Sequence, residues 1–182
     1  MKNTIFGALL FTLSAVTQAQ NQVNENANVK DKWEKYITEF YSIDIKSSWE
    51  KADSKEFGTE FIFLIDGISA ELNFRENINL LIQNLGEKNI DLDEYVSISE
   101  DQIKTMLTNA KIIESSRIKG DSYESHKIIF TGDQGTYKLK FEQRYIIYMN
   151  KAYVLTFTSQ ETNFNRFLSD TEIALSSFNF LK

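Results

Sequence analysis

The sequence predicts an α+β fold built on a mainly antiparallel β-sheet. Four strand-like stretches follow one another between residues 111 and 159, separated by short turns. Residues 92–110 instead repeat their apolar positions with the period of a helix. Helices and strands do not alternate strictly along the chain, and this order is typical of an α+β domain.

The first 19 residues have the three parts of a secretory signal peptide. Lys2 supplies a positive charge, residues 5–13 form an apolar run, and small residues lead to Ala19. The apolar run is shorter than the roughly 20 residues of a membrane-spanning helix. We therefore predict cleavage after Ala19, export to the periplasm or the medium, and no transmembrane anchor.

Composition narrows the classes of function for the remaining chain. Loss of residues 1–19 removes one base, Lys2, from the 20 bases and leaves the 26 acids, so the net charge becomes −7. This balance argues against nucleic acid, which is bound mainly through cationic contacts to phosphate. The absence of Cys excludes disulfides and thiolate chemistry. Residues 20–28 are polar and Asn-rich, which predicts a disordered N-terminus, and residues 29–182 are expected to form one domain.

The domain is expected to begin with a helix followed by a strand. Val29, Trp33, Ile37 and Phe40 fall at helical spacing, which predicts an amphipathic helix over residues 29–40. Residues 41–45 then alternate as a strand does.

A loop and a hairpin are expected next. Residues 47–58 form a turn-rich loop around Trp49, and residues 59–66 and 68–76 flank Gly67 as the two strands of a hairpin. Apolar residues occupy both faces of the first of these strands, so we expect it to be buried on both sides. A further apolar stretch covers residues 77–86.

The clearest helix is expected over residues 92–110. Asp91 and Glu94 have the spacing of a capping box, and further acids lie in the first half, where the helix dipole favours them.

Four strands should follow, at residues 111–118, 123–131, 136–148 and 152–159. The long third strand alternates apolar side chains with Lys138, Lys140, Glu142 and Arg144, which predicts one buried and one solvated face. A last helix over residues 162–176 should turn Phe164, Phe167 and Leu168 inward, before the chain closes against the sheet.

Three groups of residues could suggest catalysis, a metal or a phosphate, and each has a simpler explanation. His126 is the only histidine, and it lies mid-strand without a nucleophile motif, so we expect a surface or partly buried strand residue. The acids Asp91, Asp93, Glu94, Glu100 and Asp101 lack the Gly-containing turn of a calcium loop, and helix capping explains them better. Residues 132–135 lack the Lys of a P-loop and are expected to form a hairpin turn. We therefore predict no catalytic, cofactor-binding or metal-binding residues.

Two further groups could form binding surfaces. The basic stripe Lys138, Lys140 and Arg144 could face an anionic partner, although a solvated sheet face is the simpler interpretation. One set of aromatic residues could line a ligand groove or pack as core and cross-strand pairs: Tyr137, Tyr145, Tyr148 and Tyr153. A second set near the start of the domain could lie inside or outside the core: Trp33, Tyr41 and Trp49.

Several segments resemble the PsbP-like family in order and spacing. They are YSIDIKSSWE (residues 41–50), ENINLLIQNL (76–85), TYKLKFEQRYIIYMNKAYVLTFTS (136–159) and ALSSFNF (174–180). The resemblance covers residues 40–181, nearly the whole expected domain. One departure is that Lys46 and Ser47 stand where the family usually has Pro before the Trp-containing turn.

This resemblance implies a PsbP-like αβα sandwich, in which a central antiparallel sheet has helices on both faces, and a domain without enzymatic activity. Members of this family bind other proteins. They include a photosystem subunit in plants, a Ran-binding protein in eukaryotes and small envelope proteins in bacteria. No family site can be transferred, because no catalytic motif defines the family, and a shared fold does not carry function.

Two functions from different classes remain. The favoured one is a non-catalytic exported module that docks on an envelope or secreted protein, and it predicts an exposed apolar patch or a groove between sheet and helix. The alternative is a small-ligand carrier or a hydrolase with a Tyr-lined pocket, and it predicts a deep concavity with converging polar groups.

Overall fold

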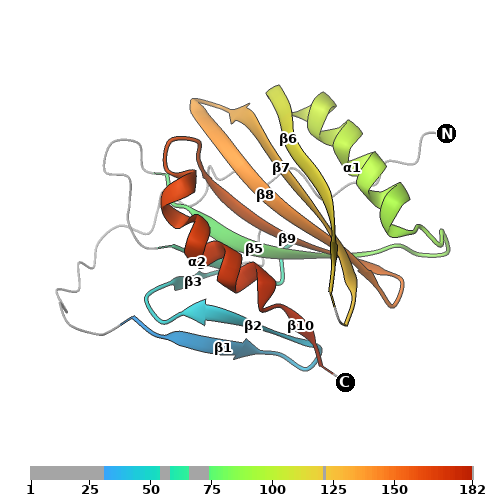
Figure 1. Cartoon of the computed structure of the whole chain (residues 1–182), viewed down its shortest axis with the longest axis horizontal. Helices are drawn as coiled ribbons and strands as arrows, with labels where there is room; N and C mark the ends of the chain where they lie inside the picture. The colour runs from blue at the N-terminus through green and yellow to red at the C-terminus, as the bar shows by residue number, and fades with distance from the viewer. Residues whose placement is uncertain (1–30, 54–57, 66–73, 121, 182) are drawn as a thin grey trace.

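The computed structural model describes residues 31–53, 58–65, 74–120 and 122–181. Within these ranges the chain forms a seven-stranded sheet, a three-stranded sheet and two helices (Figure 1). Neighbouring strands pair antiparallel in both sheets. The predicted α+β class and mainly antiparallel sheet are therefore confirmed.

The larger sheet has the strand order β3-β4-β5-β9-β8-β7-β6. Its strands are β3 (Glu50–Ala52), β4 (Phe61–Leu64), β5 (Asn77–Asn84), β6 (Thr108–Lys119), β7 (Glu124–Gln134), β8 (Tyr137–Tyr148) and β9 (Lys151–Gln160). The four strands predicted between residues 111 and 159 are β6 to β9, and their ends differ from the prediction by at most about three residues. They form a meander because each connection is a short turn.

The smaller sheet has the order β1-β2-β10. It joins β1 (Trp33–Ile37) and β2 (Tyr41–Lys46) to the two-residue strand β10 (Asn179–Phe180). The end of the chain thus pairs with a strand near its start, so this sheet closes only when both ends of the domain are folded.

Two of the three predicted helices are present. Helix α1 (Leu92–Met106) begins where predicted, and the Asp91 carboxylate accepts a hydrogen bond from the backbone N–H of Glu94 at 2.9 Å. It ends before the predicted residue 110, because Leu107 has extended backbone angles and β6 begins directly after it. Helix α2 (Phe164–Ser176) turns Phe164 and Phe167 into the core.

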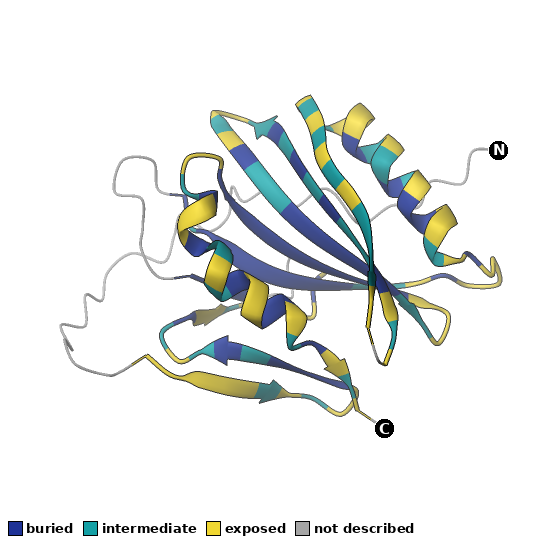
Figure 2. Ribbon diagram, viewed as in Figure 1, coloured by how far each residue is buried: buried dark blue, intermediate teal, exposed yellow. Residues whose placement is uncertain are grey.

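The apolar core divides into two clusters that share strand β9. Tyr153, Leu155 and Phe157 belong to the cluster that contains the buried residues of α2. Ala152 and Val154 belong to the cluster that contains the buried residues of α1. Neighbouring residues of a strand point to opposite faces, so β9 is buried on both sides, as Figure 2 shows for the middle of the sheet.

The helix predicted over residues 29–40 is wrong wherever the structure describes it. Residues 33–37 form β1, which pairs with β2 from Trp33↔Lys46 to Ile37↔Ser42. The apolar spacing misleads because Trp33 and Ile37, four residues apart, share one side of a strand as well as one side of a helix. Tyr36 points to the other side and packs edge-on against Phe61 and Phe63.

The loop and hairpin predictions also need correction. Strand β3 lies within residues 47–58, which were expected to form a loop. Strand β4 is buried along its whole length as predicted, and the strands it pairs with among the described residues are β3 and β5. Residues 66–73 lie outside the described residues, and residues 74–76 are not in a strand.

The leader and the N-terminal tail, residues 1–28, fall outside the described residues, so their predictions remain predictions. In the part of the chain that the structure describes, no helix is long and apolar enough to cross a membrane.

Candidate binding surface

His126 lies on β7, partly buried, as expected for a strand residue. Its Nε2 is 2.8 Å from the Ser115 hydroxyl, which donates its hydrogen to Glu100 at 2.6 Å. A serine hydroxyl has a single hydrogen, so while that hydrogen points to Glu100, Nε2 can contact Ser115 only as a donor. Ser115 therefore lies between His126 and Glu100, whereas in a hydrolytic triad the histidine lies between the serine and the carboxylate.

The surroundings of His126 also disfavour its charged form. Burial lowers the pKa of His126, and the charge of Arg117 acts in the same direction, against Glu100 and Asp93. This arrangement links α1 to β6 and β7 through Glu100, Ser115 and His126.

The acids of α1 serve the helix and its neighbours. Asp91 caps the helix, and Asp93 forms an ion pair with Arg117 of β6. No group of three or more potential metal ligands occurs among the described residues. Capping, which was preferred to calcium binding from the sequence, is confirmed for Asp91.

Residues 132–135 belong to a β-hairpin, as predicted. Gly132, Asp133 and Gln134 continue β7, and the turn itself is at Gly135 and Thr136. Gly135 has a φ of 60°, a conformation that glycine adopts without steric cost.

The predicted solvated face of β8 is wrong at Glu142 and Arg144. Their side chains are only 1% and 7% exposed, because β8 is an inner strand and Glu172 of α2 reaches over them. Lys138 of the proposed basic stripe is exposed, whereas Lys140 is half-buried and its Nζ lies 4.4 Å from the centre of the Phe164 ring. The stripe therefore offers no continuous basic surface.

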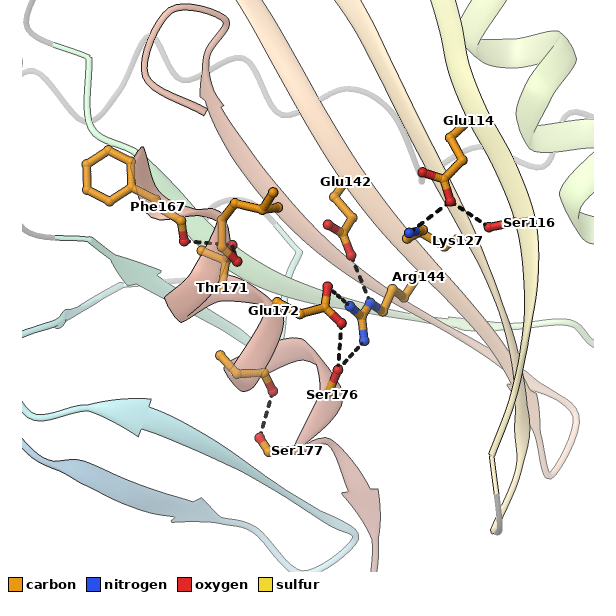
Figure 3. A network of polar contacts seen from close by, with 12 residues as sticks. Glu114, Ser116, Lys127, Glu142, Arg144, Phe167, Thr171, Glu172, Ser176 and Ser177 are labelled. Atoms are coloured by element: carbon orange, nitrogen blue, oxygen red, sulfur yellow. Dashed lines mark hydrogen bonds and ion pairs between the residues drawn. The ribbon is translucent and has the colours of Figure 1, made fainter. Parts of the chain in front are cut away.

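Arg144 instead anchors a polar network between the sheet and α2. It donates from Nε to Glu142 at 2.9 Å, from Nη1 to the Ser176 hydroxyl at 2.9 Å and from Nη2 to Glu172 at 2.6 Å. Figure 3 shows these three contacts converging on the guanidinium. This network could not be predicted from the sequence, because a solvated strand shows the same alternation of charged and apolar residues.

The four tyrosines do not line one groove. Tyr145 is fully buried in the α1 cluster, 5.8 Å from the ring of Tyr95. Tyr153 is buried on the opposite face of the sheet, where Tyr148 stacks on Phe180. Tyr137 contacts Phe74 at the far end of β8. The interpretation as core contacts is confirmed for Tyr145, whereas Tyr153 belongs to the core and also lines a cavity.

The aromatic residues near the start of the domain divide between core and surface. Tyr41 and Trp49 are buried, 2% and 7% exposed, whereas Trp33 is 38% exposed and meets Trp49 edge-on. Trp33 therefore lies at the rim of the core.

Three large apolar side chains remain exposed at one end of the smaller sheet. Ile37 is 61%, Phe40 62% and Leu181 37% exposed. The backbone N–H of Leu181 donates to the carbonyl of Phe40 at 2.8 Å, which joins the C-terminal segment to the β1–β2 turn. These three residues are called the Phe40 surface below.

The turn that carries Phe40 is held by a side chain. The Thr38 hydroxyl accepts hydrogen bonds from the N–H groups of Phe40 and Tyr41 and donates to the carbonyl of Tyr41. This bonding fixes the turn while the Phe40 ring stays in solvent. The ordering cost of presenting Phe40 to a partner is therefore already met in the free protein.

A cavity of about 280 Å³ lies beside the Phe40 surface. Phe40, Tyr41, Ile82 and Tyr153 provide its apolar lining. Its polar lining comes from Thr38, Glu39, Glu60 and Lys151. Lys151 follows the two-residue turn at Met149, whose side chain is 76% exposed. Sequence reasoning missed this site because it placed Ile37 and Phe40 on the buried face of a helix.

No protein-family model matches the chain, and no curated protein matches it. Solved structures do match. The cyanobacterial PsbP protein CyanoP from Synechocystis sp. PCC 6803 has a TM-score of 0.65 and 15% identity over 86% of this chain and 96% of that chain.

Two other solved structures show the same arrangement. LpqN of Mycobacterium tuberculosis, described as involved in cell envelope biogenesis, has a TM-score of 0.62 and 7% identity over 85% of this chain and 93% of that chain. The Ran-binding protein Mog1p of Saccharomyces cerevisiae has a TM-score of 0.53 and 8% identity over 84% and 96%. The chain therefore has a PsbP-like fold.

Proposed function

We propose that this chain is an exported, non-catalytic accessory module that binds another protein of the cell envelope through the Phe40 surface. The observation that carries the proposal is the exposure of Ile37, Phe40 and Leu181 beside a cavity with an apolar and a polar side. Grouped exposed apolar side chains with a polar rim are typical of protein-interaction sites. The hydrogen-bonded Ser115, whose proton is directed to Glu100, supports a non-catalytic role.

The chemistry of the surface indicates the kind of partner. Glu39 and Glu60 line the cavity with a single base, Lys151, and the expected processed chain carries a net charge of −7, from 20 bases less Lys2 against 26 acids. An apolar side chain with basic residues around it would complement this surface in shape and charge. We expect such a side chain of the partner to enter the cavity against Tyr41 and Tyr153.

The relatives in fold are consistent with this role without establishing it. LpqN is described by its part in cell envelope biogenesis, and Mog1p by its binding of Ran. The proposal includes a helix–sheet–helix sandwich, supported by the two core clusters on β9, and a single domain over residues 29–182. This framework would hold the Phe40 surface at one end of the smaller sheet.

Export makes a separate prediction. Residues 1–19 should be removed, because their charge, apolar run and small residues before the cleavage site match a secretory leader. Intact-mass measurement of the protein from its own cells, with N-terminal sequencing, should find a chain that begins at Gln20. A chain in the cytoplasmic fraction that retains Met1 or begins at Lys2 would contradict export.

Binding is tested by Phe40→Asp. A charge at the centre of a desolvated contact should lower the yield of crosslinked partner by about tenfold or more. The measurement is crosslinking of the processed protein in its own cell envelope, followed by mass spectrometry of the partner and of the crosslinked positions. Because Phe40 is 62% exposed, the free energy of unfolding should change by no more than about 0.5 kcal/mol.

Ile113→Asp is the matched control. Ile113 is 51% exposed on β6, outside the Phe40 surface, so its replacement should leave the partner's yield unchanged. The same partner recovered equally with wild type and Phe40→Asp would refute this surface. A loss of the partner with Ile113→Asp instead would move the binding site to β6.

A further inference from the structure

A second cavity, of about 340 Å³, lies between the C-terminal end of α2 and the strands β6 to β9. It shares no lining residue with the cavity beside the Phe40 surface. Its volume is within the range of small-molecule sites, roughly 300–1,000 Å³. Its lining has an apolar part and a polar part.

The apolar part of the lining is preformed. Ile146, Leu155 and Leu175 are at most 2% exposed and come from β8, β9 and α2. Ile118, Tyr123 and Phe178 complete this part, and the ring centres of Tyr123 and Phe178 are 6.5 Å apart. The Tyr123 hydroxyl donates to the carbonyl of Phe178, so the two aromatic residues are tied together in the free protein.

The polar part of the lining consists of hydrogen-bond donors. A guanidinium has five N–H groups, and Arg144 uses three of them, toward Glu142, Ser176 and Glu172. One N–H on each terminal nitrogen therefore remains for a bound molecule. Ser125, a residue only 6% exposed, lines the same cavity, and its hydroxyl is a possible hydrogen-bond donor.

The charge balance selects among acceptors. The guanidinium is already flanked by two carboxylates, those of Glu142 and Glu172. Lys127 of β7, beside Arg144, is itself paired with Glu114. An anionic ligand would therefore add a negative charge where three carboxylates already face two cations, in a partly desolvated site, which is unfavourable. An ammonium group would face the guanidinium directly. A neutral oxygen acceptor meets neither penalty.

We propose that this cavity binds a small neutral molecule with an apolar body and a carbonyl oxygen, and that the oxygen accepts hydrogen bonds from Arg144 and Ser125. The apolar body packs on Ile146, Leu155 and Leu175, between the rings of Tyr123 and Phe178. Ligand binding of this kind is independent of the partner that contacts the Phe40 surface.

Three probes with the same apolar chain and different heads test the proposal: hexanamide, hexanoate and hexylamine. Each is titrated into the processed protein at pH 7.5, and amide chemical shifts are followed by NMR. We expect hexanamide to saturate the amide shifts of Ser125, Ser176 and Phe178, with a dissociation constant on the order of 1 mM. Hexanoate and hexylamine should bind about tenfold more weakly.

Variants locate the site. Ser125→Val removes the hydroxyl and fills part of the cavity with a residue that suits a strand, so hexanamide affinity should fall about tenfold. Ser122→Trp, at an exposed position in the lining, should have a similar effect. Glu161→Trp, exposed and outside the lining, and Phe40→Asp should bind hexanamide as wild type does.

Two results would overturn the proposal. Equal affinity for all three probes would show that the apolar chain alone is recognised, without a carbonyl. Absence of saturable shifts, or saturation unchanged in both Ser125→Val and Ser122→Trp, would show that this cavity is not the site.

Discussion

Arg144→Met is expected to lower the free energy of unfolding by about 3–5 kcal/mol at pH 7.5. The side chains of Arg144 and Glu142 are 7% and 1% exposed, and their closest atoms are 2.9 Å apart. Methionine retains much of the length of the side chain but leaves a buried carboxylate without its counter-ion. Denaturation by urea, followed by circular dichroism, measures the difference between the two proteins.

The loss of stability should become smaller as the pH falls. Burial raises the pKa of Glu142 in the wild type, although the charge and hydrogen bond of Arg144 act to lower it. Without Arg144 this pKa rises further. A carboxyl group with a higher pKa in the folded than in the unfolded protein destabilises the fold above its folded pKa, and this effect disappears as the pH falls through that value toward the ordinary pKa of glutamic acid. The free energy of unfolding of Arg144→Met should therefore be closer to that of the wild type at pH 5 than at pH 7.5.

Glu172 also makes the stability difference between Arg144→Met and the wild type smaller as the pH falls. Burial acts to raise its pKa, but hydrogen bonds from Arg144 and Ser176 hold the pKa of Glu172 below its ordinary value. The wild type therefore loses this contribution on acidification, whereas the variant no longer has it. The contribution is small because the Glu172 side chain is 52% exposed.

The double variant Glu142→Gln/Arg144→Met is the control for this prediction. It removes the buried charge together with its partner, so it should regain most of the stability lost by Arg144→Met. Its difference from the wild type should also vary less with pH. A loss below about 1 kcal/mol in Arg144→Met would contradict the burial of Glu142 and imply that water reaches the carboxylate.

The elements predicted most accurately are those whose signals are local. Gly135 and Asn150 lie at turns with positive φ, and they delimit β8 and β9 from within the sequence. The Asp91 cap likewise marks the start of α1 through a contact with Glu94, only three residues away. These signals need no knowledge of the rest of the fold, so residues 92–160 were largely assigned correctly.

Strand β1 shows why the start of the domain is harder to predict from the sequence. The spacing of Trp33 and Ile37 fits one face of a helix and one face of a strand equally well. Pairing with β2 decides between them, and β2 is itself completed by β10 from the other end of the chain. A contact between residues about 140 positions apart, such as Phe180↔Tyr41, leaves no local pattern to be read.

The candidate sites depend on tertiary contacts in the same way. The polar residues of β8 alternate as those of a solvated strand do, and only the position of α2 makes Glu142 and Arg144 buried. The Phe40 surface is not predicted from the sequence, because the spacing of Ile37 and Phe40 indicates the buried face of a helix over residues 29–40 and not an exposed turn. The sequence could exclude thiolate chemistry, since it has no Cys, but it could not show where the chain leaves apolar side chains exposed.

Tyr145→Ala is expected to lower the free energy of unfolding by about 3–5 kcal/mol. Tyr145 has no exposed surface, and its ring packs against Tyr95 of α1 with the ring centres 5.8 Å apart. Truncation leaves a cavity at the contact between α1 and the sheet, where β8 cannot move because it is paired on both sides. Urea denaturation of the variant and the wild type measures the loss.

Two further variants separate the contribution of the ring from that of the hydroxyl. Tyr145→Phe keeps the ring and loses the hydroxyl, which donates to Gln143, so it should cost about 1 kcal/mol. Met149→Ala, at a side chain that is 76% exposed, should change stability by no more than about 0.5 kcal/mol. If Tyr145 lined a ligand groove instead, Tyr145→Ala would cost little more than Met149→Ala, because a groove already exposes the ring to water. A large loss confined to Tyr145→Ala would therefore assign this tyrosine to the core that holds α1 on the sheet, and would leave ligand binding to the cavity beside Arg144.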